Sequence, residues 1–292
     1  MALKIALKTF GMSGEDNQLK EILDQTDTAM AGETFLFPEF GAYTQEGSLK
    51  AYRVLAQRAV EKKITIITTL NHRGLDLPDA RPNTNYNTLF IFSRTGEVYS
   101  PQAKITPQSF EMNHLDARSP KINVAPYSRL NKVALRQNGE TYRTTFFICS
   151  DLYVLQLFDR SALESDAILC PANFGNGAEG SAANLIDYTV KTEIFKQGFL
   201  CNTYQKVKDG LVPLTKKMLQ SFSGNPEPVP YKKFELIQKV NTSSAIYPDD
   251  QYWNFQSMLQ LTQNGTFTVP CSRSQDNGLK VDLGEYKTVV EI

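Results

Sequence analysis

Three residues with reactive side chains stand where apolar, strand-like runs of the sequence stop. Glu39 follows "TFLFP", Lys104 follows "EVYSPQA" and Cys149 follows "TTFFI". In layered α/β proteins, the ends of strands are where side chains from distant parts of the chain converge on one crevice. Taken singly, each residue has an ordinary explanation, since lysine and glutamate are mostly exposed and cysteine is mostly buried. Taken together, the three residue types are those that acyl transfer through a thiol requires.

This chemistry needs no histidine. A thiol has a pKa of about 8.5 and is mostly protonated at neutral pH. A neighbouring carboxylate takes its proton as the sulfur attacks, and a lysine stabilises both the thiolate and the developing oxyanion. The chain has only two histidines, His72 and His114, in turn-like and polar surroundings. We therefore interpret both as loop or surface residues and expect a carboxylate to be the base for Cys149.

Composition narrows the classes of partner. Lys plus Arg and Asp plus Glu number 31 each, so no net charge attracts nucleic acid or an anionic membrane. The four cysteines form no CxxC pair, which argues against a zinc ribbon or a disulfide scaffold. No run approaches the roughly 20 apolar residues that span a bilayer, and no signal-type apolar stretch is visible. We expect a cytoplasmic protein that uses no metal or cofactor and acts on a small molecule.

Alternating strand and helix patterns predict the elements that position the reactive residues. The predicted strands are 4–10, 34–40, 64–70, a hairpin at 86–100, 146–149, 166–171, 198–204, 243–247, 265–270 and 279–283, and the predicted helices are 17–30, 48–63, 153–164 and 181–197. This order favours an α/β protein with layered sheets covered by helices. The length suits one domain over residues 1–292. Within it, the lysine- and proline-rich segment 205–240 is expected to be an insertion, either a lid or a loop packed by its own apolar residues.

Three stretches occur in an order and spacing that resemble the nitrilase, or carbon–nitrogen hydrolase, superfamily: "FLFPEFG", "YNTLFIFSRTGEVYSPQAKITPQSFE" and "FFICSDLY". Two later stretches, "DAILCPANFG" (166–175) and "NTSSAIYPDD" (241–250), are similar to further family segments. The resemblance spans roughly residues 1–205 and resumes near 241–285. It implies a four-layer α-β-β-α sandwich that assembles as a homodimer or a higher homo-oligomer.

The resemblance also implies a role for each matching residue. Cys149 is the nucleophile, and Glu39 is the general base that takes the thiol proton and later activates water. Lys104 and the backbone N–H of Ser150 hold the oxyanion, and Glu111 is the second glutamate, which positions the substrate or assists proton transfer. Asn87 matches a hairpin asparagine, which we interpret as structural.

Other positions leave the substrate open. The candidate pocket residues are Tyr43, Ser150, Tyr153, Asn173 and Phe174, which could equally be core or loop residues. Family members often have an aromatic residue where this chain has Ser150, and only Glu193 of "VKTEIFKQ" (190–197) matches the corresponding family helix. These departures affect the choice of substrate more than the reaction.

The leading hypothesis is a cysteine-dependent hydrolase of the C–N bond in a small amide or carbamoyl compound, acting through a thioester and releasing ammonia or an amine. An acyltransferase would use the same site with an amine in place of water. A catalytically silent scaffold is a third reading, but a disused site has no physical need to keep a lysine and two carboxylates together. A thiol-redox role is the weakest, because no resolving cysteine lies near Cys149 in the sequence.

Overall fold

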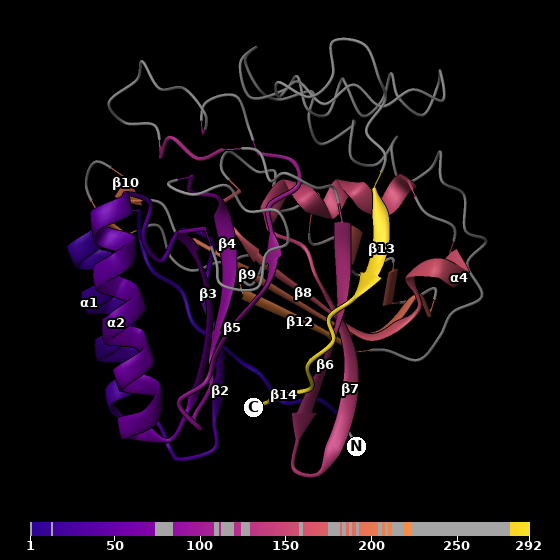
Figure 1. Ribbon diagram of the computed structural model, residues 1–292, viewed down its shortest axis with the longest axis horizontal. Coiled ribbons are helices and arrows are strands. Elements are labelled where there is room, and N and C mark those ends of the chain that lie inside the picture. The colour runs from indigo at the N-terminus through magenta and orange to yellow at the C-terminus, as the bar shows by residue number, and fades with distance from the viewer. Residues whose placement is uncertain are drawn as a thin grey trace.

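Two β-sheets pack face to face between layers of helices in the computed structural model (Figure 1). The structure describes residues 2–12, 14–73, 84–107, 111, 120–123, 129–157, 160–174, 182, 185–186, 189–190, 193–203, 206–207, 210–211, 219–223 and 281–292, and all structural statements concern these. The first sheet has the order β1 (Ala6–Leu7), β2 (Thr34–Leu36), β3 (Thr65–Asn71), β4 (Asn87–Phe92) and β5 (Val98–Ala103). The second has the order β12 (Leu219–Ser223), β9 (Phe195–Asn202), β8 (Ser165–Ala172), β7 (Glu140–Phe146), β6 (Arg129–Gln137) and β13 (Asp282–Glu285), and β14 (Val290–Glu291) also pairs with β6. A separate small hairpin joins β10 (Lys206–Val207) to β11 (Gly210–Leu211).

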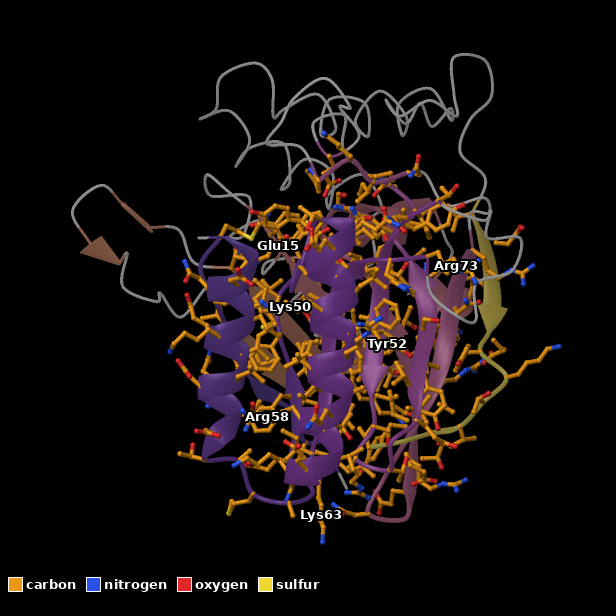
Figure 2. All side chains as sticks on the ribbon, turned by 60° about the vertical axis from the view of Figure 1, so that its left-hand side comes forward. Glu15, Lys50, Tyr52, Arg58, Lys63 and Arg73 are labelled. Carbon is orange, nitrogen blue, oxygen red and sulfur yellow. The ribbon has the colours of Figure 1, made fainter. Side chains whose placement is uncertain are left out.

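Helices cover the outer face of each sheet. Helices α1 (Glu15–Asp27) and α2 (Gln45–Lys62) lie side by side on the first sheet, and α4 (Arg160–Leu163) lies on the far side of the second (Figure 1). Ion pairs from Lys50 to Asp16 at 2.6 Å and from Arg58 to Asp27 at 2.8 Å join α2 to α1 (Figure 2). No helix in the described part of the chain is long and apolar enough to cross a membrane.

Three apolar clusters fill the spaces between the four layers. One lies between α1, α2 and the first sheet, a second between the two sheets, and a third on the outer face of the second sheet. Strand β3 is buried along its whole length, as expected for a continuous β-branched run covered on both faces. The expected four-layer α-β-β-α sandwich is confirmed.

Several predicted boundaries are wrong for identifiable reasons. Helix α2 begins at Gln45 and not at Ser48, because the Thr44 side chain accepts the Gly47 N–H and caps the helix one turn earlier. The predicted helix 181–197 ends before Phe195, where β9 begins. Strand β6 and most of β7 were missed, although an Asn138-Gly139 turn with φ of 53° and 82° joins them.

Part of the prediction concerns residues outside the described ones. The strands at 243–247 and 265–270, and the segment 241–250 that resembles a family turn, are among them. So is most of the predicted insertion at 205–240. Within that insertion, β12 pairs antiparallel with β9, which makes it the edge strand of the second sheet.

Candidate active site

Glu39 lies in the turn after β2, and contacts from three layers fix the backbone around it. Phe40 has a left-handed φ of 61°, uncommon for a bulky residue, and its N–H donates to Thr69 Oγ1 at 2.9 Å. The Gln18 side chain on α1 donates to the Phe40 carbonyl. The Glu39 N–H donates to the Ala172 carbonyl of the second sheet at 3.3 Å. Helix α1 and both sheets therefore hold this turn in place.

Lys104 follows β5 directly and is buried between two glutamates. Its Nζ donates to Oε1 of Glu39 at 2.7 Å and to Oε1 of Glu111 at 2.7 Å, and all three side chains are only 1% exposed. Burial by itself would lower the pKa of Lys104, but the charges of Glu111 and Glu39 outweigh it and raise that pKa well above its ordinary value. Lys104 is therefore a fixed cation that stays protonated throughout the physiological pH range.

Cys149 lies beyond β7, which ends at Phe146 and does not continue to the cysteine as predicted. Cys149 takes a left-handed φ of 51° and begins the 3-10 helix η1 (Cys149–Leu157). Burial and then the charge of Glu39 raise the pKa of Cys149 well above its ordinary value, while Lys104 acts in the opposite direction. The resting thiol is therefore protonated, and a base must remove its proton when it reacts.

Ser150 is the second residue of η1, where the first backbone N–H groups have no carbonyl of the same helix to bind. Its side chain is engaged elsewhere, because Ser150 Oγ donates to the Thr106 carbonyl at 2.8 Å. The backbone N–H is therefore the group of Ser150 that is suited to bind an anion next to Cys149.

Asp151 joins η1 to the segment that follows Lys104. Its carboxylate accepts the Ile105 N–H at 3.0 Å, the Thr106 N–H at 2.8 Å and the Thr106 hydroxyl at 2.8 Å, and the residue is fully buried. The sequence indicated only a turn at this position. The contacts link the residue two positions after Cys149 to the two residues after Lys104, so they limit how far these functional groups can move apart.

Replacing Asp151 with asparagine should change how stability depends on pH. Burial raises the pKa of Asp151 from 3.8 to about 6, against the opposing effects of Lys104 and the hydrogen bonds from Ile105 and Thr106. Because the unfolded aspartate ionises near pH 3.9, the folded wild type loses stability as the pH rises from about 4 to about 6. This loss corresponds to about 3 kcal/mol. Asparagine cannot ionise, so urea titrations should show the variant gaining about 3 kcal/mol relative to the wild type between about pH 4 and about pH 7.

Asp166→Asn is the matched control. Its stability relative to the wild type should change with pH in the opposite direction. Burial by itself would raise the pKa of Asp166, but hydrogen bonds from Lys196 and the Arg143 N–H lower it. The stability from Asp166 is present above the unfolded pKa and lost as the pH falls through the folded pKa, so this variant should lose relative stability as the pH rises. A pH-independent difference between the wild type and Asp151→Asn would contradict the buried, raised-pKa carboxyl.

Asn87, interpreted from the sequence as structural, contacts the same glutamate oxygen as Lys104. Its Nδ2 donates to Glu39 Oε1 at 2.6 Å, beside the 2.7 Å bond from Lys104 Nζ. The backbone carbonyl of Asn87 also accepts the backbone N–H of Lys104 at 2.8 Å. Because both strong donors bind Oε1, Oε2 is the Glu39 oxygen with capacity to accept a proton.

Comparison with solved structures identifies this arrangement of sheets. A carbon–nitrogen hydrolase superfamily protein from Xanthomonas campestris, whose structure holds an arsenic adduct in the active site, matches 72% of this chain and 79% of its own, with a TM-score of 0.51 and 14% sequence identity. The chain has the carbon–nitrogen hydrolase fold. An amidase from Nesterenkonia sp. is similar over 71% of this chain and 77% of its own, with 19% identity and a TM-score of 0.48. No protein-family model and no curated protein sequence matches the chain.

Tyr43, one of the expected pocket residues, is partly buried in the segment between the Glu39 turn and α2. Its backbone N–H donates to Glu15 Oε1 at 2.5 Å, and Glu15 lies at the start of α1 (Figure 2). Its carbonyl accepts Asn71 Nδ2 at 2.8 Å, and Asn71 pairs with Asn87 across β3 and β4. The Tyr43 backbone therefore contacts Asn71, and Asn71 is the cross-strand neighbour of Asn87, which binds Glu39.

Two of the other expected pocket residues, Asn173 and Phe174, follow β8. Asn173 is partly buried, and its Oδ1 accepts the Thr203 hydroxyl at 2.6 Å. Phe174 packs in the same apolar cluster as Cys149. The side chain of Tyr153 lies outside the described part of the structure.

Proposed function

We propose that the chain is a cysteine-dependent hydrolase that cleaves the C–N bond of a small amide or carbamoyl compound through a thioester. The observation that supports this most is the buried Lys104, bonded at 2.7 Å to both Glu39 and Glu111 beside a protonated Cys149 thiol. A buried charge cluster of this kind is costly to keep. Its chemical use is to remove a thiol proton and stabilise an anion in the same small volume.

Acylation begins with proton transfer from the Cys149 thiol to Glu39 Oε2 as the sulfur bonds to the substrate carbonyl carbon. The carbonyl oxygen becomes an oxyanion held by Lys104 Nζ and the Ser150 N–H. One such donor typically contributes about 2.7–4 kcal/mol to transition-state stabilisation. The C–N bond then breaks, the nitrogen takes the proton from Glu39, and ammonia or an amine leaves a thioester on Cys149.

Hydrolysis of the thioester reverses these roles with water as the nucleophile. Glu39 takes a proton from the water as its oxygen attacks the thioester carbon, and the same two donors hold the second oxyanion. The C–S bond breaks, the proton on Glu39 returns to the sulfur, and the acid is released. Lys104 keeps its proton throughout, and Glu111 holds the ammonium group of Lys104 in its orientation.

The test is a screen of small amides, carbamoyl compounds and nitriles for ammonia release, with and without an added amine acceptor and with Cys149→Ala as the blank. Release from an amide or carbamoyl compound by the wild type alone supports the proposal. If product forms only when the amine acceptor is present, the protein is an acyltransferase and not a hydrolase. Turnover by the nitriles alone would replace the substrate class, and turnover of any amide by the blank would exclude the thiol mechanism.

A further inference from the structure

Helix α1 reaches the turn that carries Glu39 through one buried side chain. Gln18 is completely buried, and its Nε2 donates to the Phe40 carbonyl and, more weakly, to Met12 Sδ at 3.6 Å. Because a carbonyl can only accept, the amide must turn its nitrogen and not its oxygen toward Phe40. Within the described part of the chain, Gln18 Oε1 then has no hydrogen-bond partner. Burying half of an amide unpaired costs stability, so apolar packing does not explain why a glutamine stands here.

Phe40 needs such a bond because its backbone is strained. Its φ of 61° lies in the left-handed region, which a bulky residue keeps only where surrounding contacts enforce it. The peptide that joins Phe40 to Gly41 is held at both ends. Its carbonyl accepts Gln18 Nε2, and its N–H donates to the Thr69 carbonyl at 2.9 Å. Thr69 Oγ1 also accepts the Phe40 N–H at 2.9 Å, so α1 holds the carbonyl and β3 holds the two N–H groups.

Two adjacent residues of this turn act on the same ammonium group. The Glu39 carboxylate binds Lys104 Nζ at 2.7 Å, and the centroid of the Phe40 ring lies 5.9 Å from the same nitrogen. A cation over an aromatic face at this distance is attracted to it, and more strongly when both are out of water. Phe40 is 2% exposed and Lys104 is 1% exposed. The backbone conformation at Phe40 therefore sets where both the carboxylate and the ring meet Lys104.

We propose that Gln18 is a positioning residue, which holds the Phe40 carbonyl in the left-handed turn and thereby keeps the Glu39 carboxylate against Lys104. Without this donor, the peptide after Phe40 rotates toward an unstrained conformation and Glu39 moves with it. A shift of about 1 Å in a catalytic group can cost about 100-fold in rate. The inference rests on the proposed function for its effect on catalysis, but the position of Glu39 can be measured without any substrate.

The test compares crystal structures and kinetics of the wild type and Gln18→Met, which keeps the length of the side chain and removes its donor. The φ of Phe40 should leave the left-handed region, and the contact from Lys104 Nζ to Glu39 should lengthen beyond hydrogen-bond distance. With the best amide from the screen, kcat should fall by about 10- to 100-fold. KM should change little, because the substrate's own contacts remain.

A second variant and a matched control separate positioning from general damage. Thr69→Val removes the acceptor of the Phe40 N–H and should lower kcat in the same way, even if Gln18→Met does not fold. Gln25→Met removes another amide from α1, whose Nε2 donates to the Thr9 carbonyl at 2.7 Å. Thr9 belongs to the connection between β1 and α1 and not to the Glu39 turn, so this control should keep the kcat of the wild type.

A purely structural Gln18 would give a different result. Lower stability with an unchanged Phe40 φ and an unchanged kcat would overturn the assignment, and so would an equal fall in kcat in Gln18→Met and Gln25→Met. The crystal structures decide the matter separately from the amide screen. If the screen fails and Glu39 still moves away from Lys104 in Gln18→Met, the proposed function is excluded and the positioning role stands.

Discussion

Cys149→Ala should lower the rate of amide hydrolysis by about 10⁴-fold or more, down to what substrate binding and the oxyanion donors alone provide. Alanine has no atom that can form the thioester, so both chemical steps of the proposed mechanism are lost. The protein should remain folded, because the substitution removes one sulfur atom from a buried site and introduces neither a charge nor an unpaired polar group. Initial rates with the best amide from the screen, measured beside circular dichroism, give the comparison.

Cys201→Ser is the control for this experiment. Its thiol is buried and donates to backbone carbonyls, and serine can make the same bonds. Its activity should stay within a few-fold of the wild type. An equal loss in both variants would mean that the decline reflects damaged packing and not loss of a nucleophile.

Lys104→Met should be destabilising and inactive together. The substitution leaves the buried carboxylates of Glu39 and Glu111 without the cation that each binds at 2.7 Å. Removing one partner of a buried ion pair typically costs about 3–5 kcal/mol, because the remaining charge is left uncompensated. Urea unfolding measures the loss of stability, and initial rates with the best amide from the screen measure the loss of activity.

Lys196→Met provides the matched comparison, because it also removes a lysine from an ion pair. Lys196 binds Asp166 at 2.6 Å, but its side chain is 79% exposed. An exposed pair of this kind contributes about 0.2–1 kcal/mol at most, so the variant should be nearly as stable as the wild type and fully active. Equal effects of the two substitutions would contradict the buried charge cluster.

The sequence predicts two members of this cluster, Glu39 and Lys104, because each follows a strand pattern. An apolar β-branched run can be placed in a sheet from local pattern alone, and the polar residue after it must then lie at the edge of that sheet. This reasoning places Glu39 and Lys104 in one crevice, and the structure shows a 2.7 Å contact between them. Glu111 follows only from the family resemblance, since no strand-like run ends directly before it in the sequence.

Other features depend on contacts that no local pattern encodes. The carboxylate of Asp151 is explained by the backbone of Ile105 and Thr106, more than forty residues away in the chain. The buried side-chain amide of Asn202 depends likewise on the backbone of Phe174, which follows β8. Both are polar residues in apolar surroundings, and that mismatch was the available signal.

One omission had a clear local signal. The hairpin of β6 and β7 turns at Asn138-Gly139, where both residues have positive φ. Asn-Gly between strand-like runs favours this turn because both residues tolerate the left-handed region. The strand that delivers Cys149 is consequently predicted at 146–149, whereas β7 spans Glu140–Phe146 and Cys149 begins η1.

The measurement that tests the account most directly is the mass of the protein quenched in acid during turnover of an amide. The account predicts an increase equal to the acyl group of that amide, located on the peptide that contains Cys149 and absent from Cys149→Ala. Acyl transfer to a different residue, or steady hydrolysis by Cys149→Ala, would contradict it.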